Sequence, residues 1–515
     1  MIRAIVLCLL IPGLFAVCTN PSSGQQPPPR EGLLAATLPG SSYVASRIKP
    51  PPITREFRAA WIATVFNIDW PSRPGLPASR QKSELVAILD RVQELNMNAI
   101  ILQVRPACDA LYQSSIEPWS DWLSGTMGRS PGYDPLQFAL QEAHARGIEV
   151  HAWFNPFRAL ASAKRSASAD HVTRRQPDWI RRFDGKVWLD PGLPQVRRYS
   201  TKVIMDVVSR YDVDGIHIDD YFYPYPKSPK PGAETGFPDS ESYRRYGGRK
   251  NLGDWRRANI NSFVSELYSS IKAKKPWVKF GISPFGIWQP GVPSGVEAQL
   301  DSYRMIYGDS RTWLRNGWCD YLSPQLYWPI RGEQSFSALL AWWDRENVRG
   351  RHLWPGIASD RVGGARPASE QGRQIELTRS PRRKSAGHIH WSWKPVAQNR
   401  RGLSSLLEKS YYQGGALVPA IPWSSSSRPA KPSVSVRGDS KAMFVDWKPG
   451  KGSTPTHWVV QTRHNGKWAH ARVVASRKRG IKFDLGRRQT PPDVISVTAG
   501  NRYGNVSDPA VVQRR

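Results

Sequence analysis

The stretch Gly215-Ile-His-Ile-Asp-Asp220 decides the fold, because it reads as a short strand that ends in two carboxylates. Side chains alternate between the two faces of a strand, so Ile216 and Ile218 form an apolar face while His217 and Asp219 lie on the other. An apolar face turned toward helices, with polar residues at the carboxyl end of the strand, is typical of a (β/α)8 barrel. We therefore predict that Asp219 enters the mouth of such a barrel.

The same pattern recurs from Arg55 to about Tyr412, where short apolar strands alternate with amphipathic helices in eight β-α units. The expected strands are residues 57–66, 99–106, 148–158, 215–222, 279–288, 320–328, 352–360 and 387–394. The expected helices lie near residues 79–95, 133–146, 194–210, 254–274, 296–315, 335–348, 369–381 and 402–409. These units predict an α/β fold, a (β/α)8 TIM-type barrel over residues 53–415. A doubly wound sheet is the alternative, but no glycine-rich phosphate turn follows the first strand.

Polar side chains recur at the carboxyl ends of several expected strands. The alternation of faces places these residues on the inner side of the barrel: Gln103, Arg105, His151, Asn155, His217, Ser283, Ser323, Gln325 and Tyr327. A single one of them could be a hydrogen-bonded core residue. Their convergence on one mouth is instead what a barrel active site requires.

Aromatic residues gather at or just beyond the same strand ends, often in proline-containing loops such as residues 221–226. They are Trp153, Tyr221, Phe222, Tyr223, Tyr225, Phe285, Trp288, Tyr327, Trp328, Trp391 and Trp393. Core aromatics would not be concentrated in such loops, and flat rings stack well on the apolar faces of sugars. The pattern favours a carbohydrate ligand.

Asp219 and Asp220 carry the strongest chemical signal. Hydrolysis of a glycosidic bond needs a carboxylic acid that protonates the leaving oxygen and a second group that acts at the anomeric carbon. Adjacent carboxylates raise each other's proton affinity, which keeps one of them protonated near neutral pH. A metal site or a helix cap is the other interpretation, but no ligand cluster accompanies His217, and we expect no metal or cofactor. His388 and His390 have the spacing of two ligands, and we interpret them as hydrogen-bonded barrel residues.

Several long segments resemble the glycosyl hydrolase-like family 10 domain over about residues 53–415. They include EFRAAWIATV, QVRPACDALY, AWFNPFR, VDGIHIDDYFYPYP, GISPFGIW and CDYLSPQLYW, in the order expected for the family. The resemblance implies a secreted or lipid-anchored bacterial enzyme that cleaves glycan strands, preferably peptidoglycan stripped of its stem peptides. It also implies catalysis by Asp219 and Asp220, with substrate binding by Gln103, Arg105, Asn155, Gln325 and Tyr327.

Position in the predicted barrel adds further substrate contacts, namely Asp109, Trp153, His217, Tyr221, Ser283, Trp328 and Trp391. The second catalytic carboxylate stays open between Asp109, Glu117 and Asp360. If the substrate carries N-acetyl groups, one carboxylate of the Asp219–Asp220 pair could instead orient the acetamido group while the other donates the proton. A non-catalytic carbohydrate-binding barrel and a glycosidase for another polysaccharide are the alternative functions.

The N-terminus is typical of a secretory signal over residues 1–18, with Arg3 followed by about a dozen apolar positions. Cys18 is a candidate site for lipid attachment, although Val17 stands where a small residue is expected. Residues 19–52 have the composition of a disordered tether. We expect export to the periplasm or cell envelope, with membrane contact only through a lipid anchor at Cys18.

The C-terminal part has its own organisation. Residues 416–428 read as a serine-rich linker, and residues 429–515 alternate as short strands that resemble a fibronectin type III domain, notably in DWKPG and VTAGNRYGNVS. We expect that the barrel still folds without residues 429–515.

The net charge bears on the possible binding partners, and the positions of the cysteines bear on whether they form a disulfide. The chain has 73 Lys and Arg against 42 Asp and Glu, a net charge of +31, but the basic pairs are scattered and no nucleic-acid-binding motif accompanies them. The surplus indicates either a solvated basic surface or contact with an anionic envelope polymer, and it gives no support for a nucleic-acid partner. For the C-terminal module, a passive spacer is as well supported as such a contact. Cys108 and Cys319 are expected to be free, because they fall at opposite ends of the predicted barrel.

Overall fold

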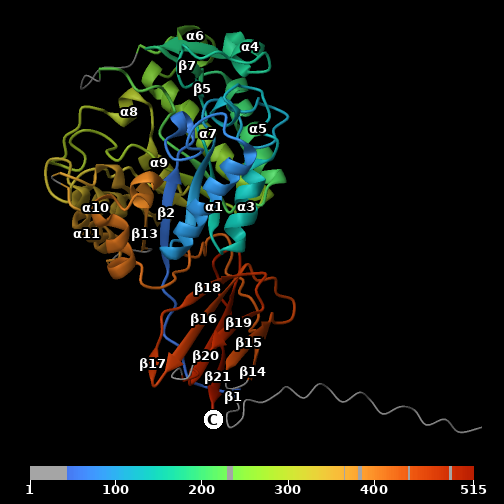
Figure 1. Cartoon of the computed structure of the whole chain (residues 1–515). Coiled ribbons are helices and arrows are strands. Elements are labelled where there is room, and N and C mark those ends of the chain that lie inside the picture. Colours follow the sequence, from blue (N-terminus) through green and yellow to red (C-terminus); the bar gives the residue numbers. More distant parts are fainter. Residues whose placement is uncertain (1–42, 229–235, 365, 381–385, 439–440, 486–489) are drawn as a thin grey trace, which may run out of the picture.

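The computed structural model describes residues 43–228, 236–364, 366–380, 386–438, 441–485 and 490–515, which form two units stacked end to end (Figure 1). The larger unit has a parallel sheet with helices around it, and the smaller one, red in Figure 1, consists of strands. The expected signal segment, Cys18 and residues 19–42 of the expected tether lie outside the described residues. None of the described helices combines the length and the apolar character needed to cross a bilayer.

The parallel sheet closes on itself into a barrel. Its strand order is β11-β10-β9-β8-β4-β3-β2-β13-β12, and β11 (His352–Leu353) and β12 (Gly356–Ala358) are separated only by Trp354 and Pro355. This one extended stretch pairs with β10 on one side and with β13 on the other, so the described strands supply eight barrel positions. The α/β barrel predicted from the sequence is confirmed. The remaining strands are β2 (Glu56–Ile62), β3 (Ala99–Arg105), β4 (Glu149–Phe154), β8 (Gly215–Ile218), β9 (Lys279–Ile282), β10 (Tyr321–Leu322) and β13 (Ala386–Trp391).

Helices lie outside the sheet between successive strands (Figure 1). The longer ones are α1 (Ala78–Glu94), α3 (Pro135–Ala145), α5 (Pro194–Arg210), α7 (Leu252–Lys274), α10 (Phe336–Glu346) and α11 (Ala368–Thr378). Shorter elements fill the loops: η1 (Val65–Asn67), α2 (Asp121–Ser124), β5 (Arg158–Leu160), α4 (Val172–Arg175), β6 (Ile180–Phe183), β7 (Lys186–Leu189), α6 (Ser240–Tyr246), α12 (Trp393–Ala397) and α13 (Leu403–Leu406).

The single helix expected over residues 296–315 is wrong. Two short helices, α8 (Ser302–Met305) and α9 (Ser310–Asn316), occupy the second half of this stretch. Tyr307 between them has a φ of +54°, a left-handed conformation that cannot continue a helix. The Asp309 side chain then caps α9 by accepting a hydrogen bond from the backbone of Thr312.

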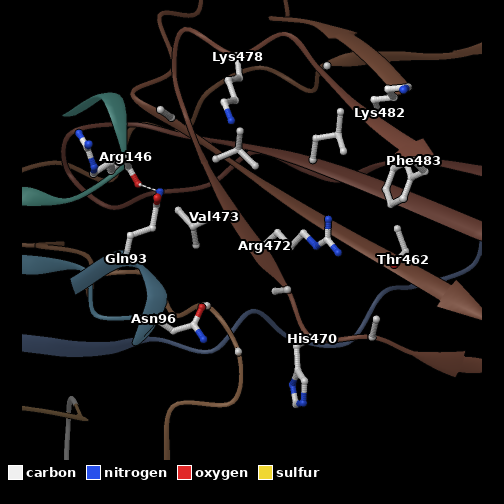
Figure 2. Close-up of a pocket in the computed structure, with 18 of the residues that line it drawn as sticks. Gln93, Asn96, Arg146, Thr462, His470, Arg472, Val473, Lys478, Lys482 and Phe483 are labelled. Carbon is white, nitrogen blue, oxygen red and sulfur yellow. Dashed lines mark hydrogen bonds between the residues drawn. The ribbon is translucent and has the colours of Figure 1, made fainter. Parts of the chain in front are cut away.

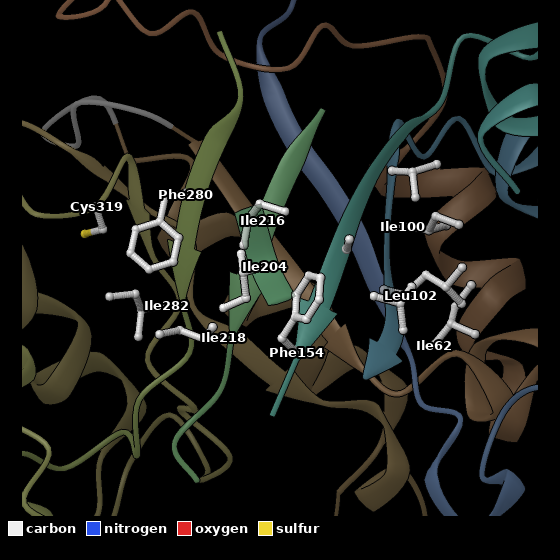
Figure 3. Packing of buried hydrophobic residues seen from close by; sticks show 14 of the residues in the cluster. Ile62, Ile100, Leu102, Phe154, Ile204, Ile216, Ile218, Phe280, Ile282 and Cys319 are labelled. Carbon is white, nitrogen blue, oxygen red and sulfur yellow. The ribbon is translucent and has the colours of Figure 1, made fainter. Parts of the chain in front are cut away.

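The outer face of the barrel carries the apolar residues that the alternation predicted. Ile216 and Ile218 of β8 and Phe280 and Ile282 of β9 are fully buried, and Ile204 of α5 belongs to the same cluster (Figure 3). Burying a side chain of this size contributes about 1.5–3 kcal/mol. The layer between strands and helices is therefore the main hydrophobic core of the barrel.

Aromatic and histidine side chains fill the inside of the barrel and form one hydrogen-bonded chain. Trp61 Nε1 can only donate, so it donates to His217 Nε2 at 3.1 Å and leaves the His217 proton on Nδ1. His217 Nδ1 donates to the Tyr321 hydroxyl at 3.0 Å, which donates in turn to His151 Nδ1 at 2.8 Å. His151 Nε2 then lies 3.1 Å from the carboxylate of Glu149 at the base. We refer to this set as the axial chain.

His217 belongs to the axial chain and has no exposed surface, so it does not make the substrate contact expected of it. Burial, together with the neighbouring His151, holds the pKa of His217 well below its usual range. The ring is therefore neutral, as the hydrogen bond from Trp61 requires.

The C-terminal unit consists of two antiparallel sheets, which confirms an all-β region. One sheet has the order β14 (Ser433–Gly438), β15 (Ala442–Lys448), β19 (Gly480–Asp484). The other has the order β1 (Tyr43–Ala45), β21 (Ala510–Arg514), β20 (Val494–Gly500), β16 (His457–His464), β17 (Lys467–Trp468), and β18 (Arg472–Ala475) also pairs with β16. Trp447 and Trp458 lie in the core that these sheets share.

The last part of the expected tether is ordered. Tyr43–Ala45 form β1, which pairs antiparallel with β21 at the far end of the chain. The Tyr43 ring packs against the core of the C-terminal unit, and its hydroxyl donates to the carbonyl of Pro492. Composition alone could not reveal this strand, because its partner lies more than 400 residues away.

Residues 416–428, expected as a linker, are packed between the two units. The Leu417 backbone N–H donates to the Thr54 carbonyl at 2.9 Å, and Trp423 Nε1 donates to Asp320 at 2.7 Å. Cys108 and Cys319 are both free and buried, as predicted. Cys108 follows β3 at the mouth, whereas Cys319 precedes β10 at the base.

Tyr321→Phe is expected to lower the free energy of unfolding by about 1–3 kcal/mol, because it leaves buried nitrogens of His151 and His217 without a partner. Urea denaturation measures the change. Tyr246→Phe, at a half-buried position of α6, is the control and should change stability by less than about 0.5 kcal/mol. Equal stability of the two variants would contradict a stabilising role of the axial chain.

Candidate active site

Asp219 follows β8 at the carboxyl end of the barrel, on the inner side, as the alternation predicted. Its Oδ2 accepts hydrogen bonds from Trp153 Nε1 at 3.1 Å and from Asn155 Nδ2, and its Oδ1 accepts from the Tyr221 backbone at 3.2 Å. Only 5% of the residue is exposed. The carboxyl group is thus held by donors from two neighbouring strand ends and presents one small surface to the mouth.

Asp220 turns toward a different part of the mouth. It accepts hydrogen bonds from the Tyr225 hydroxyl and from the side chain of Gln325, which follows β10. Gln325 Nε2 also lies 3.1 Å from the backbone carbonyl of Ser283. The Ser283 residue itself is 1% exposed, so it positions Gln325 and offers almost no surface to a substrate.

Burial raises the pKa of both carboxyl groups, to about 7 for Asp219 and about 6 for Asp220. Repulsion between the two adds to the rise at Asp219. The hydrogen bond from Tyr225 acts in the opposite direction on Asp220. The coupled pair therefore keeps a proton to a higher pH than free carboxyl groups do. One protonated and one ionised carboxyl group is the state that general-acid cleavage of a glycosidic bond requires.

Asn155 connects Asp219 to a second buried amide. Asn155 Oδ1 accepts a hydrogen bond from Gln103 Nε2 at 2.6 Å, and Gln103 Oε1 accepts from the backbone N–H groups of residues 64 and 65, each at 3.0 Å. These bonds fix both amide orientations, so that Asn155 Nδ2 must point at Asp219. Both amides are fully buried. They position the carboxyl group, and the structure gives no surface for the substrate contacts expected of them.

Arg158 is a site residue that the sequence analysis missed. Its Nη2 donates to Asn155 Oδ1 at 2.8 Å, its Nε donates to the Pro106 carbonyl at 2.8 Å, and its guanidinium lies 4.8 Å from the centre of the Tyr221 ring. Its positive charge opposes the rise in pKa at both carboxyl groups of the pair. The sequence feature that could have identified Arg158 is its position at the end of the AWFNPFR segment, three residues after Asn155.

A β-bulge removes Arg105 from the mouth. The register of β3 on β4 shifts between Gln103 and Arg105, which ends the simple alternation of faces. Arg105 instead forms a buried ion pair with Glu117, with Nε–Oε2 at 2.8 Å and Nη2–Oε1 at 2.6 Å. Asp109 is also buried and accepts a hydrogen bond from the backbone two residues earlier at 2.8 Å. The structure therefore places Arg105, Glu117 and Asp109 in the buried support of the loop after β3.

Half-buried aromatic rings line the mouth. Tyr327 and Trp391 are stacked with centroids 6.4 Å apart, and Trp153 meets Trp391 edge-on at 6.2 Å. Burial raises the pKa of Tyr327 well above its usual range, and the charges of Asp220, Asp360 and Asp219 add to the rise. The predicted contacts with partial exposure are Tyr221, Gln325, Tyr327, Trp328 and Trp391. Phe222, Tyr223 and Trp393, also expected at the mouth, are buried core residues.

The histidine pair of β13 has the structural role predicted for it. His388 and His390 both contact the Tyr412 hydroxyl, the latter at 2.9 Å, and His390 Nδ1 lies 2.8 Å from Ser359 Oγ. Within the described ranges, no group of His, Cys, Asp or Glu has an arrangement that could hold a metal ion.

Comparison with known proteins places this barrel in a family. The model of the glycosyl hydrolase-like 10 family matches residues 56–372. The chain belongs to this family. The glycosyl hydrolase YngK of Bacillus subtilis is 41% identical over 444 residues, which cover 82% of this chain and 86% of YngK. The glycosyl hydrolase DigH of Escherichia coli is 39% identical over 342 residues, which cover 61% of this chain and 76% of DigH.

Solved structures add a distant likeness. The PgaB (BpsB) glycoside hydrolase domain from Bordetella bronchiseptica is 13% identical, with a TM-score of 0.46 over 69% of this chain and 98% of that domain. Family membership, rather than this likeness, decides the class of the chain: it is a glycoside hydrolase.

Asp360 differs from the other two candidates for a second catalytic carboxylate in this glycosyl hydrolase-like 10 barrel. It follows β12 at the mouth and is exposed, whereas Asp109 and Glu117 are buried in the support of another loop. Asp360 is therefore the one of the three candidates that is exposed to solvent.

The raised pKa of Asp219 predicts a pH-dependent stability. The folded pKa of about 7 lies above the ordinary value of 3.8, so the folded state binds more protons between these values and loses stability as the pH rises through them. Asp219→Asn removes this loss. The stability of the variant relative to the wild type should rise by on the order of 4 kcal/mol from pH 4 to pH 8.

Urea denaturation at both pH values measures this difference. Asp178→Asn, at an exposed position, is the matched control and should show the same offset from the wild type at both. A pH-independent offset for Asp219→Asn would mean that its pKa is not raised in the folded protein.

Proposed function

We propose that this glycoside hydrolase is an exported or envelope-anchored enzyme that cleaves the glycan strands of peptidoglycan lacking stem peptides. The observation that carries the proposal is the buried carboxyl pair, Asp219 and Asp220, within a mouth lined by half-exposed aromatic rings. Such rings stack on pyranose faces, and the pair supplies a proton near neutral pH. The segments shared with the family support the substrate class, and the apolar N-terminus with Cys18 supports export.

In the mechanism we propose, Asp219 donates its proton to the leaving glycosidic oxygen while Asp220 stays ionised. Asp220, held by Tyr225 and Gln325, orients the 2-acetamido group of the substrate. The acetamido oxygen forms a bond to the anomeric carbon as the glycosidic bond breaks, and the proton of Asp219 leaves with the released sugar. Water then opens the cyclic intermediate with Asp219 as the base, so the configuration is retained.

A conventional pair is the second candidate mechanism, and the exposed position of Asp360 favours it as the partner carboxylate. In that case Asp219 remains the acid and Asp360 acts from the other side of the bound sugar. The two routes differ in inhibition. A thiazoline analogue of N-acetylglucosamine should inhibit only the acetamide route, and inversion of configuration in the product would eliminate that route.

The substrate is tested by incubating the purified protein with intact peptidoglycan, peptide-free peptidoglycan, chitin and other polysaccharides, followed by mass analysis of the soluble products. Products from peptide-free peptidoglycan alone support the proposal. Products from a different polysaccharide would replace the substrate, and binding without products would indicate a carbohydrate-binding barrel.

Asp219→Asn should reduce kcat on the cleaved glycan by at least about 10²–10⁴-fold, because the amide cannot protonate the leaving oxygen. The thermal midpoint should not fall, since the amide keeps the shape of the carboxyl group. Asp178→Asn should retain full activity. Near-normal kcat in the Asp219 variant would remove this residue from the proposed mechanism.

For the C-terminal unit we propose a fibronectin type III-like fold and a contact with an anionic envelope polymer. Its two antiparallel sheets, one of three strands and one of six, support the fold. A cavity of about 1110 Å³ between this unit and the barrel base supports the contact (Figure 2). Figure 2 shows Arg472, Lys478 and Lys482 on one side and Arg146 on the other.

The charges of this cavity are unbalanced. None of the described residues that line it is Asp or Glu. Arg146 pairs with two carboxylates outside the cavity and Lys482 with Asp484. No salt bridge joins Arg472 or Lys478 to a carboxylate in the described part of the chain, so both can meet an external anion.

Arg472→Gln combined with Lys478→Gln should weaken binding of inorganic polyphosphate by about tenfold at low salt. Lys448→Gln combined with Lys451→Gln, exposed positions of the same unit outside the cavity lining, is the control. Polyglutamate as a second probe separates phosphate from carboxylate recognition. Equal affinity of both double variants for polyphosphate would contradict a specific anion site.

A further inference from the structure

Phe66 stands out by its exposure. Among the described residues, Phe66 and Val348 are the large apolar side chains with strong exposure, at 57% each. Phe66 lies in η1, directly after β2, and therefore on the mouth side of the barrel. Val348 lies between α10 and β11, at the base. The two exposed side chains are thus at opposite ends, and only Phe66 borders the catalytic mouth.

The backbone at Phe66 is strained. Phe66 has a φ of +55° and Asn67 a φ of +51°, so two consecutive residues with side chains occupy the left-handed region. Glycine would adopt this conformation freely, whereas a β-carbon makes it unfavourable. Burial does not compensate for the strain at Phe66, since most of the ring is in water. Strained residues of this kind are typical of ligand-binding positions.

The loop nevertheless holds the ring in a fixed place. Asn67 Nδ2 donates to the carbonyls of Pro71 and Trp122 at 2.9 and 3.0 Å. Asp69 Oδ2 accepts from the Ala63 backbone at 2.9 Å. The Phe66 ring meets the Trp122 ring nearly edge-on, with centroids 5.1 Å apart. A ring fixed in this way loses little conformational entropy when a ligand stacks on it.

The same loop is joined to the catalytic carboxyl group. Gln103 accepts hydrogen bonds from the backbone of residues 64 and 65, and its other end donates to Asn155, which donates to Asp219. Phe66 is the next residue after this anchor. Trp122, of α2 after β3, lies beneath Arg165, whose guanidinium is 3.7 Å from its ring centre. Loops after three successive strands, β2, β3 and β4, thus build this part of the rim.

We propose that Phe66 is a stacking platform for a pyranose ring of the glycan strand, at a position beyond the bond that is cleaved. The proposal rests on the proposed function, in that it takes the substrate to be a glycan polymer. A lone aromatic ring matches the size of one sugar, whereas a protein partner would need a contiguous apolar patch of several hundred Å². The platform would favour long strands over short oligosaccharides.

The test compares Phe66→Ala with the wild type on long glycan strands and on the shortest oligosaccharide that the enzyme cleaves. KM for long strands should rise about tenfold, with kcat and the short-substrate parameters unchanged. Phe66→Trp should restore KM, and Val348→Ala is the matched control for loss of an exposed apolar side chain. Unchanged KM on long strands, or an equal loss on long and short substrates, would overturn the proposal.

Phe66→Gly supplies a second readout. It should raise the thermal midpoint by relieving the backbone strain while weakening sedimentation with insoluble glycan strands, a combination that a purely structural role would not produce. If the wild type cleaves no glycan, the proposed function fails, and the sedimentation assay still decides the platform. Equal sedimentation of Phe66→Gly and wild type would then reject it.

Discussion

Two adjacent carboxyl groups held almost entirely out of water are the constraint on which the mouth of this barrel depends. An ionised carboxylate in such a place is costly, so the pKa of Asp219 and Asp220 rises and the pair keeps a proton near neutral pH. Donors from other strand ends limit that cost: Trp153 in β4 and Asn155 directly after it on one group, and Gln325 after β10 on the other. A closed barrel is what brings these distant segments to one point.

Most of the polar residues around this pair act on each other and not on the substrate. Gln103 and Asn155 fix the orientation of Asp219. The positive charge of Arg158 opposes the rise in the pKa of Asp219 that its repulsion from Asp220 causes. The hydrogen bonds of the axial chain keep Trp61 and His217 in one arrangement. The buried hydrogen bonds among these residues give a site that needs little reorganisation during reaction. The surface left for a glycan is mainly aromatic, and Phe66 extends it along the rim.

The two ends of the molecule have different chemistry. The mouth combines a carboxyl pair that keeps a proton with aromatic rings. The base, where the C-terminal unit packs, has a cavity lined by Arg472 and Lys478, for which the described part of the chain offers no salt-bridge partner. Strand β1 near the start of the described chain pairs with β21 near its end, within the C-terminal unit. Binding of an anionic polymer at the base would leave the mouth free for a glycan.

The sequence by itself determined the features that depend on local periodicity. The alternation of apolar and polar residues from Gly215 to Asp220 places Ile216 and Ile218 outside and Asp219 inside, and its eightfold repetition predicts the barrel. Only the tertiary structure decided which polar groups pair. The bulge in β3 directs Arg105 toward Glu117, with which it forms an ion pair. The Tyr225 hydroxyl donates to Asp220, and Gln103 is a buried residue that supports the site. Burial patterns repeat within a few residues and can be read locally, whereas a hydrogen-bond partner is fixed by strand register and loop path, which join residues that lie far apart in the chain.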